Sequence, residues 1–301
     1  MIGSLIEALQ YTFMRNALMA GVLVSVACGI IGTFVVIKRI VFISGGIAHT
    51  AYGGIGLGYY VRYMVLPVLF AGSAAIQDPR PGAWPLAGAV LFSLGAAVVM
   101  GLIQRRTSQR ADTIIGVLWA LGMATGIIFV DLTEGYKVDL MSYLFGSILA
   151  VERGELWLML ALDGVILALV ALFYKELVAI SFDETFATVA NVPVDIIYIG
   201  LLSMIALTVV MMMRVVGLIM VIAMLTMPAA IAGHFFRNLK KMMAGAVVLG
   251  VCFTVLGLFI SYTWNLTSGA SIILVSGVGY LLSLALQPLI SESQSYSRNQ
   301  Q

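Results

Sequence analysis

Long apolar runs separated by short polar segments dominate the 301-residue chain. Most runs have the length of about 20 residues that an α-helix needs to cross a bilayer, and they lack the period-2 alternation of a membrane β-strand. Two shorter apolar segments, 61–76 and 138–150, are interpreted as re-entrant or interfacial. The pattern predicts nine spanning helices, with eight or ten as alternatives, at 14–37, 43–60, 84–104, 113–131, 155–173, 196–213, 216–233, 243–263 and 269–288.

The composition is that of a membrane protein: 61% of the residues are hydrophobic, 10% are charged and the mean hydropathy is +1.07. A soluble fold of this size cannot bury so much apolar surface. We therefore expect an all-α, polytopic integral membrane protein surrounded by the lipid bilayer. The net charge of +2 does not favour a nucleic-acid partner. No enzymatic activity is expected, because the sequence contains neither an ATP-binding P-loop nor a paired Ser/His, paired Asp or His-Glu-x-x-His motif.

Basic residues near the ends of the predicted spans give the orientation. If nine spans alternate, one side holds a group of basic residues: Lys38, Arg39, Arg105, Arg106, Arg110, Lys175, Arg237, Lys240 and Lys241. This side is the cytoplasm by the positive-inside rule, so the C-terminus is expected inside and the N-terminus outside. Residues 1–290 form one transmembrane domain, and the polar segment 291–301 is expected to be a disordered tail.

One of the two histidines, His49, lies in the glycine-rich predicted helix 43–60. An ionisable side chain within a membrane span is costly and indicates a ligand, an ion path or a helix contact. His49 lies beside a stripe of small residues at every fourth position, along which another helix can approach closely. The stripe consists of Gly46, Thr50, Gly54 and Gly58. Two interpretations stay open: a hydrogen bond across helices, or a metal ligand on a cation path.

Asp163 is the carboxylate that lies well inside a predicted span. A buried carboxylate needs a partner or becomes neutral. It is a second candidate for contact with a cation. The alternative is that this span begins later than expected, so that Asp163 reaches the outer interface.

The predicted cytoplasmic segment 174–195 contains Ser181-Phe-Asp-Glu184, which has the spacing of a capping box. It predicts a helix over 182–190 with Ser181 as the N-cap, ended by Asn191 and Pro193. The apolar face of this helix, with Asp183 and Glu184 beside it, favours docking of a soluble protein over lying on a bilayer, for which a basic polar face is expected. The candidate docking residues are Phe182, Asp183, Glu184, Phe186, Val189 and Pro193.

Several further stretches occur in a specific order: Phe13–Gly21, Gly32–Arg39, Leu140–Leu149, Ser181–Ala187, Val216–Ala230, Gly257–Tyr262 and Ser268–Ala270. Together they resemble the permease subunits of the zinc/manganese/iron class of ABC importers over nearly the whole chain. The resemblance implies a homodimeric, type II ABC importer-like permease in the cytoplasmic (inner) membrane of a prokaryote.

The same resemblance implies the partners. Two copies of a separate ATPase subunit would bind ATP and dock on residues 182–193, and an extracytoplasmic binding protein would deliver the divalent metal ion. The chain itself would hold no cofactor. His49 matches the histidine of the family's Asp-x-x-x-His pattern on this helix.

The sequence departs from that pattern at three positions. Gly45 stands at the Asp position, Gly53 replaces a proline, and Asn265 stands where the last hairpin usually has Asp. This helix alone therefore cannot supply two ligands. Either Asp163 or an outer-loop acid completes the site, or the metal passes with weaker coordination.

The sequence thus predicts a permease for zinc, manganese or iron. One alternative is an importer of a metal chelate or a vitamin-like compound, whose wide path needs no intramembrane histidine. Another is a stand-alone secondary cation transporter, which needs ion-coupling carboxylates inside its spans.

Overall fold

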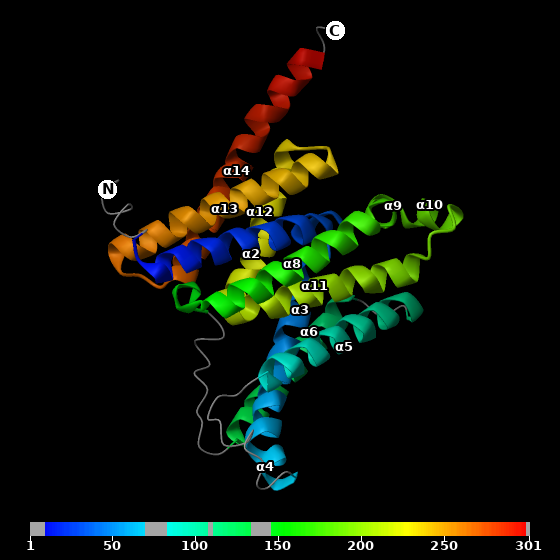
Figure 1. Cartoon of the computed structure of the whole chain (residues 1–301). Helices are drawn as coiled ribbons and strands as arrows, with labels where there is room; N and C mark the ends of the chain where they lie inside the picture. Colours follow the sequence, from blue (N-terminus) through cyan, green and yellow to red (C-terminus); the bar gives the residue numbers. More distant parts are fainter. Residues whose placement is uncertain (1–9, 70–82, 108–110, 134–145, 299–301) are drawn as a thin grey trace. The chain divides into compact units, whose positions relative to one another are not determined.

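The computed structural model describes residues 10–69, 83–107, 111–133 and 146–298, and these residues form helices and connecting segments without a strand. Figure 1 shows their order along the chain. The elements are α2 (Thr12–Ile37), α3 (Val41–Tyr60), the π-helical η1 (Val61–Val65), α4 (Leu66–Leu69), α5 (Trp84–Arg106), α6 (Ala111–Asp131), the 3-10 turn η3 (Ile148–Ala150), α8 (Arg153–Leu172), α9 (Tyr174–Phe182), α10 (Glu184–Val189), α11 (Val194–Val216), α12 (Leu218–Phe235), α13 (Leu239–Trp264) and α14 (Ser268–Arg298).

Eight helices of the described part are long and apolar enough to cross a membrane. The helix α3 is a further element of 20 residues, but its glycines, tyrosines and His49 make it less apolar. Nearly all of α3 is buried in the protein. A helix surrounded by other helices does not need a lipid-compatible surface, because its neighbours take the place of lipid. The all-α, multi-span fold predicted from the sequence is confirmed.

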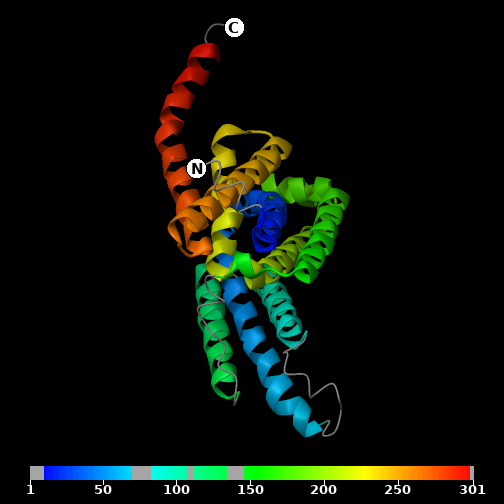
Figure 2. The same cartoon turned by 60° about the vertical axis from the view of Figure 1, so that its left-hand side comes forward.

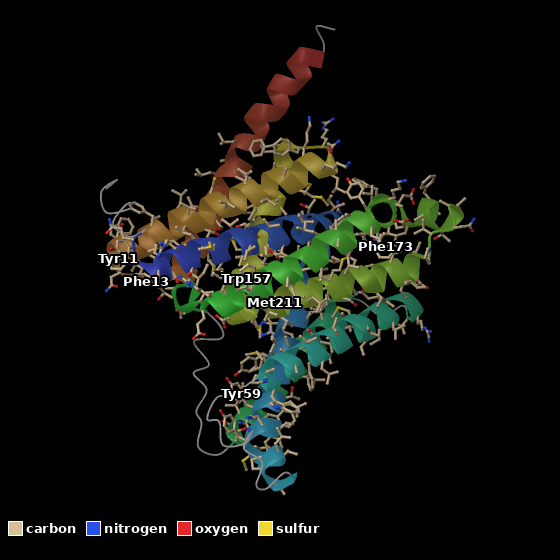
Figure 3. The ribbon with its side chains drawn as sticks, viewed as in Figure 1. Tyr11, Phe13, Tyr59, Trp157, Phe173 and Met211 are labelled. Carbon is tan, nitrogen blue, oxygen red and sulfur yellow. The ribbon has the colours of Figure 1, made fainter. Side chains whose placement is uncertain are left out.

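The chain divides into two compact units. The first unit comprises residues 1–37, 145–163 and 215–301. In it, α2 packs against α12 and α13, and α14 packs against the same two helices. Glycines allow these approaches: a Cβ on Gly32 of α2 would lie 2.0 Å from the carbonyl oxygen of Leu225 in α12. Tyr11 and Phe13 stack at the beginning of α2, with ring centroids 5.5 Å apart (Figure 3).

The second unit comprises residues 38–144 and 164–214. Its centre is α3, which lies between α5 and α6 (Figure 2). Near the end of α3, Tyr59, which is labelled in Figure 3, stacks on Tyr63 of η1 with ring centroids 6.2 Å apart.

Three segments differ from their sequence-based description or lie outside the described residues. Of the expected re-entrant segment 61–76, the described part continues α3 as η1 and α4 up to Leu69. In the segment 138–150, residues 138–145 lie outside the described part, and Ile148–Ala150 form a 3-10 turn. The helix α14 runs on to Arg298 and so includes most of the polar segment 291–301.

The packing of α3 on α5 gives a prediction with a matched control on one helix. A Cβ on Gly88 would lie 2.1 Å from the carbonyl oxygen of Gly54, whereas a Cβ on Gly95 meets nothing within 4 Å. We expect Gly88→Ala to destabilise the protein by about 1–3 kcal/mol, because backbone atoms cannot yield without moving a helix. Gly95→Ala should leave stability unchanged or raise it by up to about 1 kcal/mol. Melting temperatures of the purified variants in detergent measure both, and equal effects would contradict this packing.

Candidate functional site

Close backbone contacts on two sides hold α3 in place. Toward α5, a Cβ on Gly58 would lie 2.4 Å from the carbonyl oxygen of Trp84, and Gly54 meets Gly88 as described above. Toward α6, a Cβ on Gly53 would lie 2.8 Å from the carbonyl oxygen of Gly122, and one on Gly56 would lie 2.4 Å from that of Gly126. Any side chain at these positions would push the neighbouring helix away.

The predicted stripe of small residues is therefore divided between two neighbours. Gly54 and Gly58 face α5, whereas Thr50 faces α6 and lies 3.3 Å from the Leu118 carbonyl oxygen, with its hydroxyl also donating to the Gly46 carbonyl. Around Gly46, a Cβ would meet only ordinary contacts with Ile115 and Met100 at 3.4–3.6 Å. The close backbone contacts with α6 are made at Gly53, four residues after His49, and at Gly56.

His49 lies inside the second unit, with 7% of its surface exposed. Its ring stacks on Trp119 of α6, with centroids 4.2 Å apart and planes inclined by 20°. The buried Nδ1 atom has no hydrogen-bond partner among the described residues. Among the described residues Nδ1 makes no hydrogen bond across helices, and the two interpretations from the sequence, such a bond or a metal ligand, both stay predictions. Stacking fixes the plane of the imidazole and leaves a nitrogen available as a donor ligand or hydrogen-bonding group.

Asp163 lies in α8, at the edge of the first unit, and only 3% of its surface is exposed. Neither of its carboxylate oxygens has a hydrogen-bond partner among the described residues. A buried carboxylate without a partner is unfavourable in an apolar environment. Among the described residues, no group of three or more His, Cys, Asp or Glu side chains is close enough to hold a metal ion. His49 belongs to the second unit and Asp163 to the first.

The predicted capping box at Ser181 is wrong. Ser181 belongs to α9, where its hydroxyl donates to the Leu177 carbonyl oxygen at 2.6 Å. Asp183 is the N-cap of α10, and its side chain accepts the Phe186 amide at 2.9 Å. The helix accordingly spans 184–189 rather than 182–190. Asp and Ser are both favoured N-cap residues. An N-cap residue has a non-helical backbone, and here Asp183 is extended whereas Ser181 lies within α9.

The predicted end of this helix agrees with the structure. Asn191 has a φ of +57°, its amide donates to the Thr188 carbonyl, and the Val192 amide donates to the Ala187 carbonyl. These two bonds form a Schellman motif, in which a left-handed residue ends the helix. Pro193 follows directly and precedes α11.

Figure 1 shows α9 and α10 as two short helices between α8 and α11, and Figure 3 labels Phe173, the N-cap of α9.

Three apolar side chains of this segment are exposed: Phe182 at 64%, Phe186 at 65% and Val189 at 78%. We call this set, made up of Phe182 at the end of α9 with Phe186 and Val189 of α10, the exposed apolar face of α10. Ala187, on the opposite side of the helix, is fully buried. Large apolar residues exposed together on one surface mark a contact with another protein or with a membrane.

Glu184, expected among the docking residues, turns its carboxylate toward two cations of its own chain. One oxygen accepts a hydrogen bond from the Lys38 ammonium, and the other accepts one from Arg105 at 2.8 Å. Lys38 also donates to the Ile180 carbonyl oxygen at 2.8 Å. All these residues belong to the second unit.

Two residues in the first turns of α11 complete this group. Asp195 lies 3.3 Å from Nε of Arg105. The Tyr198 ring lies 4.7 Å from the Arg105 guanidinium and 5.5 Å from the Lys38 ammonium, and its hydroxyl donates to Gln104. We call Lys38, Arg105, Glu184, Asp195 and Tyr198 the ion cluster.

The sequence places the basic members of the ion cluster on one side of the membrane but assigns them no partner. Lys38 and Glu184 are 146 residues apart, and Arg105 and Glu184 are 79 apart. Partial burial of Glu184 acts to raise its pKa, but the hydrogen bonds and charges of Lys38 and Arg105 outweigh this and lower the pKa below its ordinary value. Glu184 is therefore ionised throughout the physiological range.

The multi-span helical fold, with a partly exposed segment between two spans, is that of a polytopic membrane protein. The family model of the ABC 3 transport family matches residues 10–287. The chain therefore belongs to the ABC 3 transport family and is a permease subunit of the metal-ion ABC importer class.

Individual relatives match over almost the whole chain. The membrane protein slr2045 of Synechocystis sp. is 56% identical over 95% of both chains. The manganese import system permease protein ScaB of Streptococcus gordonii is 30% identical over 96% of both chains. Among solved structures, PsaBC from Streptococcus pneumoniae in complex with Fab has a TM-score of 0.78 and 30% identity, covering 94% of this chain and 95% of its own.

Proposed function

We propose that this chain is the permease subunit of an ATP-driven importer that moves a divalent transition metal ion into the cytoplasm, with manganese as the first candidate. The similarity to ScaB, a manganese import permease, supports this metal. Zinc and iron(II) are the other candidates, because imidazole and carboxylate ligands accept all three and metal availability decides among them.

The same proposal includes the assembly. Two copies of the chain form the permease in the cytoplasmic membrane, with the C-terminus on the cytoplasmic side and a separate ATPase subunit docked on each copy. An extracytoplasmic binding protein delivers the metal ion. The basic residues of the ion cluster support the orientation, since Lys38 and Arg105 lie next to the segment that the positive-inside rule places in the cytoplasm.

The observation that carries the proposal is His49 with its unpartnered Nδ1. A buried polar atom without a partner costs about 1–3 kcal/mol, so its retention inside a membrane helix needs a compensating role. A passing metal ion supplies the missing partner. With Gly45 in place of a second ligand, binding to His49 is weak, and weak binding favours release as well as entry.

Asp163 is proposed as a separate oxygen ligand along the path. Its carboxylate is buried and its oxygens have no hydrogen-bond partner among the described residues, so a divalent cation would remove the cost of its burial. A carboxylate oxygen suits manganese in particular, which prefers oxygen ligands more than zinc does. Asp163→Asn keeps the shape of the side chain and removes the charge, so that its effect on transport can be measured independently of His49.

Metal uptake tests the role of His49 directly. In proteoliposomes containing the permease, its ATPase and the binding protein, His49→Ala should lower ATP-dependent uptake of radioactive manganese at least about tenfold, the scale on which a disturbed metal site loses affinity. Trp119→Phe keeps the imidazole and an aromatic face beside it, and should retain most of the uptake. Excess unlabelled zinc or iron(II) identifies the preferred ion by competition. Uptake by His49→Ala equal to that of the wild type would contradict the ligand role and favour a wide path for a chelate.

The exposed apolar face of α10 is proposed as the docking surface for the ATPase. Phe186 lies at the centre of this surface and is 65% exposed. An exposed aromatic residue that becomes buried in an interface often contributes about 2 kcal/mol or more to the binding free energy. Phe186→Ala should therefore weaken the affinity for the ATPase roughly thirtyfold.

Co-purification of a tagged permease with its ATPase measures this loss. The matched control is Leu91→Ala, which removes an equally exposed apolar side chain (67%) from the middle of α5. Phe186→Ala with wild-type ATPase content would place the docking surface elsewhere.

A further inference from the structure

Glu184 lies at the first position of α10 but does not belong to its exposed apolar face. Its two oxygens bind two cations on separate elements, Lys38 and Arg105, whose side chains are 11% and 21% exposed. An isolated ion pair on the surface contributes little to stability. Here, one carboxylate accepts charge-assisted bonds from two partly buried cations, which makes the contact stronger and directional.

The two cations belong to segments that adjoin the helix bearing His49. Lys38 lies in the turn that leads into α3, and Arg105 lies in the last turn of α5. Farther along these helices, α3 and α5 are in backbone contact, since a Cβ on Gly54 would lie 2.1 Å from the carbonyl oxygen of Gly88. Glu184 is thus linked to α3 through Lys38 and to α5 through Arg105. These two helices cannot slide freely past each other.

The remaining contacts of the ion cluster hold the cations in position. The Lys38 ammonium also donates to the Ile180 carbonyl at the end of α9, and Arg105 contacts Asp195 in α11. The Tyr198 ring lies beside both cations. Lys38 and Arg105 balance Glu184 and Asp195 in charge, so the cluster is neutral and keeps its partners without attracting other ions.

We propose that Glu184 is a positioning residue that transmits displacement of α10 to α3 and α5, and so links the docking surface to the helix that carries His49. This inference rests on the proposed function, in which an ATPase docks on α10. It separates two roles within one short helix: Phe186 and its apolar neighbours hold the ATPase, whereas Glu184 transmits its movement into the permease.

The test measures metal transported per ATP hydrolysed by the reconstituted complex of permease, ATPase and binding protein. Glu184→Gln keeps the size of the side chain but loses the charge that holds both cations. We expect it to retain the bound ATPase and its basal ATP hydrolysis, while manganese uptake per ATP falls at least about fivefold, the lower end of typical coupling between sites. The control Glu176→Gln makes the same change on α9, eight residues earlier, where the acid has no part in the ion cluster, and should leave the ratio unchanged.

Reciprocal exchange of charges provides a readout that a purely structural role would not give. Lys38→Glu and Glu184→Lys should each lower uptake per ATP, and the double variant should recover part of it, because the opposite charges face each other again. An uptake ratio for Glu184→Gln equal to that of the wild type would overturn the inference. Loss of the ATPase from Glu184→Gln would also overturn it, by making Glu184 a docking residue. If the wild-type complex itself transports no metal, the proposed function fails, which is distinct from either result.

Discussion

The close approach of α3 to its neighbours is the constraint on which the second unit depends. Glycines on one side of α3 meet glycine and carbonyl groups of α5, and glycines on the other side meet those of α6. Such packing gains van der Waals contact and leaves almost no surface of α3 for lipid. It also explains how a histidine can lie within this helix: the imidazole is covered by Trp119 of α6 rather than exposed to hydrocarbon.

Because both faces of α3 are in backbone contact, a force applied at its beginning is not absorbed by side-chain rearrangement. Packed backbones behave as rigid contacts. A closely packed protein interior changes between one or two discrete arrangements and does not deform continuously. The ion cluster lies where such a force would enter, beside the turn that leads into α3 and at the end of α5. The central claim is therefore that α10, α3 and α5 move as one piece when the ATPase moves α10.

Much of this arrangement could be predicted from the sequence. The lengths of the apolar runs predict the spans, the small residues of α3 predict close helix contacts, and Asn191 with Pro193 predicts the end of α10. Each of these signals is local or periodic, and local signals depend on backbone conformations that a few neighbouring residues determine.

The remaining features depend on residues far apart in the chain. Glu184 has the spacing of a capping-box residue relative to Ser181, but two cations from distant segments are stronger partners for its carboxylate than one backbone amide. The division of the small residues of α3 between α5 and α6 could not be predicted either, since a stripe of glycines shows that a helix approaches but not which helix. His49 is the intermediate case. Its sequence context indicated a protein-facing position, but the partner that its ring stacks on, Trp119, lies 70 residues away.

The most direct test of the central claim is a distance measurement within the second unit. Spin labels at Thr185→Cys in α10 and Leu91→Cys in α5, in a chain with Cys28 and Cys252 replaced by Ala, report the distance between these helices in the assembled complex with its ATPase. The account predicts the same distance distribution in the nucleotide-free and ATP-bound states. A shift on the order of one helical turn, about 5.4 Å, would show that α10 slides past α5 and would contradict the account.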